Sequence, residues 1–117
     1  MAFNIIIAGS RGFNDRVLLA DKLAKLLVNK TNICVICGTA RGADFLGREW
    51  AQHNGHEVIN MAAQWDTHGK RAGYIRNTQM AKIADACVVF WDGQSRGSKH
   101  MIDICHERDI PLRVVQY

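Results

Sequence analysis

The sequence has 117 residues, 48% of which are hydrophobic, and it carries a formal net charge of +4. This length predicts a single domain spanning residues 1–117, and the hydrophobic content excludes an intrinsically disordered chain. The small charge and the absence of a long basic run argue against a protein that binds nucleic acid.

Strands and helices are expected to alternate along the chain. Apolar runs predict strands at residues 4–8, 32–37, 57–61, 86–91 and 112–115. Helices are expected at residues 15–28, 43–54, 70–84 and 98–107, with a polar loop before the third. The fully apolar strands suit a parallel sheet that is covered on both faces. The alternation therefore predicts an α/β fold, a Rossmann-like doubly wound parallel sheet of about five strands with helices on both faces.

Three of the apolar runs end in a loop that carries an arginine followed by a glycine. The carboxyl ends of parallel strands meet at one edge of a sheet, so these loops are expected to lie together. Their backbone N–H groups, guanidinium groups and helix N-termini would suit a phosphate or a nucleotide. The loop residues expected to contact a ligand are Gly9, Ser10, Arg11, Gly38, Thr39, Arg41, Gly42, Asp44, Asp92, Gly93, Ser95, Arg96, Gly97 and Ser98.

Each loop also has a simpler interpretation. Any one of them could be an ordinary turn with a solvated arginine, but three such turns at one edge favour a binding site. Asp44 lies in the first turn of a predicted helix, where it is expected to cap that helix, although it could instead bind a ribose hydroxyl. Ser98 is likewise expected to cap the helix that follows the third loop.

Arg76 is an unusual residue within the helix expected at residues 70–84. It falls in a stripe otherwise formed by Ala72, Ile75, Gln79, Met80 and Ile83. Two roles stay open, a structural ion pair with an internal acid or a guanidinium at the floor of a pocket, because an unpaired buried charge is costly. Three aromatic residues are expected in the core or at an interface, or else stacked on a base: Trp65, Tyr74 and Trp91.

The cysteines and histidines do not indicate a metal site. Cys34 and Cys37 form a C-x-x-C within a predicted strand, where residues three apart face opposite sides. The first residues lack the basic region of a signal peptide, and no apolar stretch approaches the roughly 20 residues that span a bilayer. Cysteines in apolar segments therefore favour a reducing, cytoplasmic location with no membrane partner.

The chain resembles the YspA-like branch of the SLOG superfamily in four ordered motifs: IAGSRGFND, GTARGAD, WDTHGKRAGYIRNTQM and VVFWDGQSRGSKHMI. This superfamily also includes the LOG (lonely guy) phosphoribohydrolases and the Smf/DprA proteins. The resemblance extends from Asn4 to Val115 and implies a Rossmann-like fold that binds nucleotides or their derivatives, including ADP-ribose-like molecules. It also implies that Arg76 and Asn77 line the pocket and that the chain forms dimers or larger homo-oligomers.

One departure from the LOG pattern bears on catalysis. LOG enzymes use a P-G-G-x-G-T-x-x-E loop whose glutamate serves cleavage of the base–ribose bond, and Met101 stands at the corresponding position. A methionine cannot act as acid or base, so no catalytic residue and no cofactor are assigned. We expect a protein that senses or sequesters a nucleotide-derived small molecule, such as an immune signal.

Two alternatives remain open. One is a hydrolase acting on an N-glycosidic or phosphate bond, with Asp44 or Asp92 as its carboxylate. The other is a single-stranded DNA binder, by analogy with Smf/DprA. The modest net charge of +4 and the lack of a stripe of basic and aromatic residues argue against it.

Overall fold

The computed structural model describes residues 2–117, and Met1, the first residue of the predicted domain, lies outside them. Five strands form one parallel sheet in the order β3-β2-β1-β4-β5. They are β1 (Phe3–Gly9), β2 (Ile33–Cys37), β3 (Glu57–Asn60), β4 (Ala86–Trp91) and β5 (Leu112–Gln116). The central strands β1, β2 and β4 are largely buried, as their apolar sequences predict for a sheet covered on both faces.

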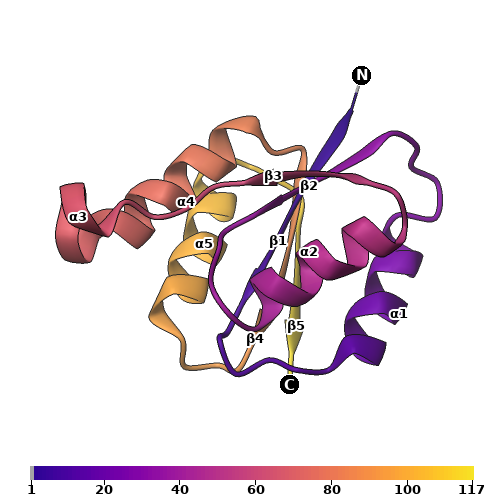
Figure 1. The fold of residues 1–117 in the computed structure, drawn as a ribbon, viewed down its shortest axis with the longest axis horizontal. Helices are drawn as coiled ribbons and strands as arrows, with labels where there is room; N and C mark the ends of the chain where they lie inside the picture. Colours follow the sequence, from indigo (N-terminus) through magenta and orange to yellow (C-terminus); the bar gives the residue numbers. More distant parts are fainter. Residues whose placement is uncertain (1) are drawn as a thin grey trace.

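Helices cover both faces of this sheet. They are α1 (Arg16–Leu26), α2 (Ala43–His53), α3 (Trp65–His68), α4 (Ala72–Ile83) and α5 (Arg96–Glu107). The helices α1 and α2 pack on one face, and α4 and α5 pack on the other (Figure 1). The predicted Rossmann-like α/β fold is therefore confirmed. Because β2 and β4 flank β1 on opposite sides, the strand order reverses at β1, which is where ligands bind in open sheets of this kind.

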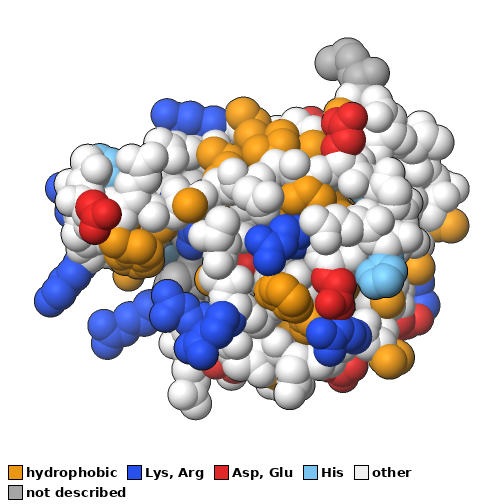
Figure 2. All heavy atoms as spheres, in the orientation of Figure 1, with side chains coloured by type: hydrophobic (Ala, Val, Ile, Leu, Met, Phe, Trp, Pro, Cys, Tyr) orange, Lys and Arg blue, Asp and Glu red, His pale blue; other side chains and the backbone are white. Residues whose placement is uncertain are grey.

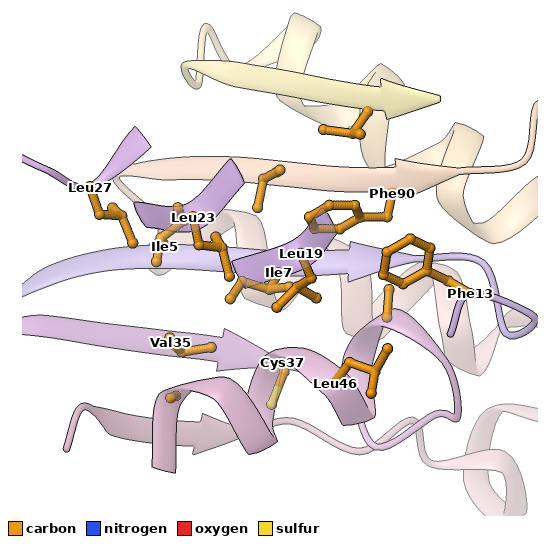
Figure 3. Close-up of a cluster of buried hydrophobic side chains, with 14 of the residues drawn as sticks. Ile5, Ile7, Phe13, Leu19, Leu23, Leu27, Val35, Cys37, Leu46 and Phe90 are labelled. Atoms are coloured by element: carbon orange, nitrogen blue, oxygen red, sulfur yellow. The ribbon is translucent and has the colours of Figure 1, made fainter. Parts of the chain in front are cut away.

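Successive residues of β1 contribute to two different hydrophobic clusters. Ile5 and Ile7 pack against α1 and α2 (Figure 3), whereas Ile6 packs on the opposite face against α4 and α5. Phe13, from the loop after β1, stacks on Phe90 of β4 with ring centroids 4.7 Å apart. This aromatic contact anchors the first arginine-bearing loop to the carboxyl end of β4.

The segment between β3 and α4 differs from the prediction. The short helix α3 occupies part of the expected polar loop, and a turn of 3₁₀ helix, Gly69–Arg71, separates it from α4. Gly69 has a φ of 59° and its N–H donates to the carbonyl of Trp65, so it ends α3 and redirects the chain. As a result α3 projects from the body of the molecule at the left of Figure 1.

The start of α5 also differs from the prediction, since the helix begins at Arg96 rather than at Ser98. Ser95 is the N-cap, and its Oγ accepts the Ser98 backbone N–H at 3.4 Å. The prediction that Ser98 caps this helix is therefore wrong. At α1 the N-cap is Asp15, whose Oδ1 accepts the Leu18 backbone N–H at 2.9 Å.

Further features concern membranes, metals and cysteines. Within residues 2–117, no helix combines the length and the apolar character needed to cross a lipid bilayer. In that same part of the chain, no three His, Cys, Asp or Glu side chains lie close enough to hold a metal ion. Cys34 and Cys37 are buried free thiols, as are the remaining two cysteines.

Candidate functional site

A cleft of about 490 Å³ lies at the carboxyl ends of β1, β2 and β4. Its walls come from the loops after these strands, from α4 and from the first turn of α5. A volume of this size is typical of small-molecule sites. The predicted residues that line the cleft are Gly9, Ser10, Arg11, Gly38, Asp44, Arg76, Asn77, Asp92, Ser95, Gly97 and Ser98. The expected meeting of the three loops at one edge of the sheet is therefore observed.

Positive charge is gathered around this cleft. Figure 2 shows Lys and Arg side chains on the lower left of the molecule, below the projecting helix α3. The cations that line the cleft are Arg11, Lys70 and Arg76. The two acidic residues on its lining, Asp44 and Asp92, are both engaged by backbone N–H groups.

Ser10 joins the first loop to the two others. Its backbone N–H donates to the Phe90 carbonyl at 2.9 Å, and its carbonyl accepts the Ala43 N–H at 3.3 Å. Its side-chain Oγ accepts the backbone N–H of Asp92 at 3.1 Å. Ser10 is 2% exposed, so its hydroxyl lies at the base of the cleft and holds the third loop in position.

Asp92 organises the loop that leads into α5. Its Oδ1 accepts the backbone N–H groups of Gln94 at 2.8 Å and of Ser95 at 2.9 Å. These bonds lower the pKa of Asp92, because they stabilise the ionised carboxylate. The same turn presents Ser95 as the cap of α5, which explains why that helix starts earlier than predicted.

Gly38, directly after β2, allows two charged side chains to approach the floor of the cleft. A side chain at this position would collide with Nη1 of Arg76 and with Oδ2 of Asp44. Asp44 is 6% exposed, and its carboxylate accepts the Ala40 backbone N–H. Burial raises the pKa of Asp44 to about 6, although the nearby Arg76 and the Ala40 N–H oppose this shift.

Asp44 does not cap α2, contrary to the preferred prediction. The N-cap residue is Gly42, which has no side chain that could bond to the helix. The Asp44 carboxylate lies instead beside Gly38, in the preceding loop.

Arg76 projects into the cleft without an acidic partner. Among the described residues, none of the ion pairs involves Arg76. Its Nη1 donates to the carbonyl of Met61 at 3.3 Å, and its Nε donates to Oδ1 of Asn77 at 3.2 Å. Of the two roles left open by the sequence, the lack of a close ion pair among the described residues favours the guanidinium at the floor of a pocket.

Asn77 fixes the position of Arg76 and joins α4 to α5. Its Nδ2 donates to the carbonyl of Gly97 at 3.2 Å and lies 3.3 Å from Nδ1 of His100. Burial lowers the pKa of His100, which favours the neutral ring that can accept this bond. The amide of Asn77 thus already has partners within the protein, and a contact of Asn77 with the ligand stays a prediction.

Comparisons with known proteins identify the family. A sequence model of the YspA, cpYpsA-related SLOG family matches residues 3–68, which run from β1 to α3. The Gene 61 protein of Mycobacterium phage D29 is 36% identical over 115 residues, covering 92% of each chain. The chain belongs to this SLOG family. No solved structure gives a significant match. Membership indicates a function related to nucleotides, either binding or hydrolysis.

Some predicted residues of this SLOG chain lie outside the main cleft. Thr39 and Arg41 line an adjoining hollow of about 250 Å³ that shares Arg11 and Arg76 with the cleft. Gly42 does not line the cleft. It has a φ of 76° and lies against the backbone of the first loop. The expected convergence of arginines on the cleft is therefore direct for Arg11 and Arg76, and Arg41 lies beside it.

The last two predicted residues face another hollow. Gly93 and Arg96 line a space of about 500 Å³ that meets the main cleft only at Tyr74. Arg96 was expected to contact a ligand from the loop before the last helix. It lies outside the cleft because it is instead the first residue of α5.

Several cleft residues of this SLOG chain were not assigned to the site from its sequence. Trp65 and Tyr74 were expected mainly in the core or at an interface, but they are 52% and 43% exposed and line the cleft. Met101, at the position of the LOG glutamate, is buried and contributes to the lining. Lys70 adds a cation from the turn before α4. The available signal was the density of aromatic and basic residues between α3 and Arg76.

Proposed function

We propose that the protein binds a nucleotide-derived small molecule in the cleft and does not turn it over. The candidate ligands are ADP-ribose-like molecules and cyclic or other phosphorylated nucleotides. The observation that carries this proposal is the convergence of three loops, from β1, β2 and β4, on one cleft at the point where the strand order reverses.

The chemistry of the lining supports an anionic ligand. Arg11 and Arg76 offer planar guanidinium groups, which form paired hydrogen bonds to phosphate oxygens. Ser10 and Ser98 offer hydroxyl groups, and the 12-residue helix α5 directs its N-terminus toward the same space. The ionised carboxylate of Asp92 opposes an anionic ligand only in part, because two backbone N–H groups donate to it.

A binder of this kind would act as a sensor or would sequester a signal. A relative is a phage protein, so sequestration of an immune nucleotide signal is the version that we favour for a first test. Self-association as a dimer or larger homo-oligomer stays a prediction, and light scattering coupled to size exclusion would measure it.

The experiment has two parts. Mass spectrometry of small molecules that co-purify with the protein identifies the candidate ligand. The protein is then incubated with ADP-ribose, AMP and cyclic nucleotides, denatured, and the supernatant is analysed. We expect the bound ligand to be recovered unchanged and in stoichiometric amount. Failure of all probes to bind would contradict the proposal, and catalytic loss of a probe would replace it with the enzyme described next.

A second candidate function is hydrolysis, and one observation favours Asp44 over Asp92 as its carboxylate. Asp44 is buried beside the cleft with a pKa of about 6, so it could give or accept a proton near neutral pH. Asp92 has a lowered pKa and would be a weaker base. If a probe is consumed, Asp44→Asn should abolish that loss while Asp92→Asn should not.

A further inference from the structure

Two chemically different kinds of group line the cleft. Ser10, Arg11 and the N-terminal turn of α5 suit an anion. The aromatic side chains of Trp65 and Tyr74, from α3 and α4, suit a flat apolar group. Arg11, Arg76 and Trp65 also line the adjoining hollow, so the indole lies near two cations. A ligand that uses both kinds of contact joins an anionic group to a flat apolar group.

Trp65 is exposed and lies against α4. The indole is 52% exposed, although it lines a cleft rather than an isolated patch of surface. Its Cη2 lies 3.5 Å from the point where a Cβ on Gly73 would be, so the six-membered ring rests against α4. Trp65 also lines the adjoining hollow, and it therefore forms a wall between two spaces.

Tyr74 has less free ring surface than Trp65. The Tyr74 ring packs against His100, with ring centroids 4.4 Å apart and a tilt of 47°. Among the described residues, no aromatic ring stacks on Trp65. The indole thus presents the larger unoccupied aromatic surface in the cleft, and bases of every kind stack on such a surface.

We propose that Trp65 is the base-recognition residue of this site, so that the ligand class is a phosphorylated nucleoside whose base stacks on the indole. The phosphate or pyrophosphate lies toward Arg11, Arg76 and the start of α5. This inference rests on the proposed function and adds which side chain contacts the base. A sugar phosphate without a base would contact the cations but not the indole.

The test compares AMP with ribose 5-phosphate, which lacks the base, and adds ADP-ribose as a larger ligand with the same base. Isothermal titration calorimetry measures ADP-ribose, AMP and ribose 5-phosphate with the wild type, Trp65→Ala, Trp65→Leu and Trp65→Phe. We expect Trp65→Ala and Trp65→Leu to weaken ADP-ribose and AMP by roughly 5- to 150-fold, the range of one lost stacking contact. Trp65→Phe should restore much of this loss, and ribose 5-phosphate should bind all four proteins equally. Melting temperatures check that each variant is folded. We expect them to change little, because the Trp65 side chain is half exposed.

The outcomes separate this inference from the proposed function. If no probe binds the wild type, both are overturned. If ADP-ribose binds wild type and Trp65→Ala equally, the base-stacking role alone is overturned and the binding function stands. A loss shared equally by ribose 5-phosphate would also overturn it. So would a change in oligomeric mass of Trp65→Ala without a change in affinity, which would make Trp65 an interface residue.

Discussion

The guanidinium of Arg76 and the carboxylate of Asp44 converge on Gly38 from two different helices, yet no ion pair joins them among the described residues. The buried Asp44 keeps a raised pKa of about 6, and Arg76 keeps donor capacity beyond its bonds to Met61 and Asn77. This arrangement leaves a cation available at the floor of the cleft, because the nearby acid does not neutralise it directly.

Arg76→Ala should abolish or greatly reduce the rise in melting temperature that ADP-ribose produces. A charged hydrogen bond to phosphate is worth about 1.5–3 kcal/mol, and the loss of a planar guanidinium removes more than one donor. The melting temperature without ligand should change little, because Arg76 makes two long hydrogen bonds and no ion pair. Differential scanning fluorimetry with and without ADP-ribose measures both quantities.

Arg113→Ala is a matched control for this measurement. Arg113 lies on the edge strand β5, outside the main cleft, and it is exposed. Its replacement should leave the ligand-induced shift unchanged. A large fall in the ligand-free melting temperature of Arg76→Ala would instead assign that residue a structural role.

Ligand affinity should depend on pH through Asp44. As the pH falls through about 6, Asp44 gains a proton, the cleft loses one negative charge, and an anionic ligand should bind more tightly. ADP-ribose is the suitable probe, because its pyrophosphate lacks the phosphate ionisation near pH 6 that AMP has. Calorimetry between about pH 5 and 8 should show this rise for the wild type and a flatter profile for Asp44→Asn. Parallel profiles for the two proteins would show that Asp44 does not couple to the ligand.

The same residue should affect folding stability in the absence of ligand. The pKa of Asp44 is raised from 3.8 to about 6 in the folded protein, so folding is favoured when Asp44 is protonated. That contribution is fully present below about pH 4 and is lost as the pH rises through about 6. Relative to Asp44→Asn, the wild type should lose on the order of 2–3 kcal/mol over this interval.

Urea unfolding at several pH values measures this difference. The Asn variant keeps an acceptor for the Ala40 N–H, and other titrating groups, such as His100, cancel when the two proteins are compared. A wild-type minus variant difference that stays constant from acid to neutral pH would mean that Asp44 is not protonated in this range.

Gly42→Ala should destabilise the protein more than Gly12→Ala. Gly42 has a φ of 76°, and an added Cβ would meet the backbone carbonyl oxygens of Ser10 and Arg11. Strain in this region together with the collision should cost about 1–3 kcal/mol or more. Gly12 has open space around it, so its substitution should be nearly neutral. Equal losses in urea unfolding would contradict this account of the second loop.

The sheet and the meeting of the loops could be predicted from the sequence, because both depend on short-range patterns. The apolar run at residues 86–91 became β4 with the same bounds, and the three loops follow strands that all run in parallel. Fully buried strands leave a clear signal, since every residue in them must be apolar. The family resemblance placed Arg76 in the pocket, and the structure brings that side chain to the cleft.

The remaining details depend on contacts between distant segments or on structures too short to show a pattern. The four-residue helix α3 has no measurable periodicity, so its position and the exposure of Trp65 could not be deduced. The early start of α5 depends on the turn that the Asp92 side chain forms. Asp44 matched a common capping pattern, but its carboxylate lies beside Gly38, a contact between separate segments that the pattern does not encode.

The hydrogen bond between Ser10 Oγ and the Asp92 N–H joins residues 82 positions apart. The base of the cleft therefore forms only once β4 has docked beside β1. Contacts between segments so far apart in the sequence form late in folding. Recovery of ADP-ribose binding during refolding should consequently lag behind the return of helical circular dichroism. Residues 3–68, the stretch shared with the family model, should not bind that molecule when produced as a separate fragment.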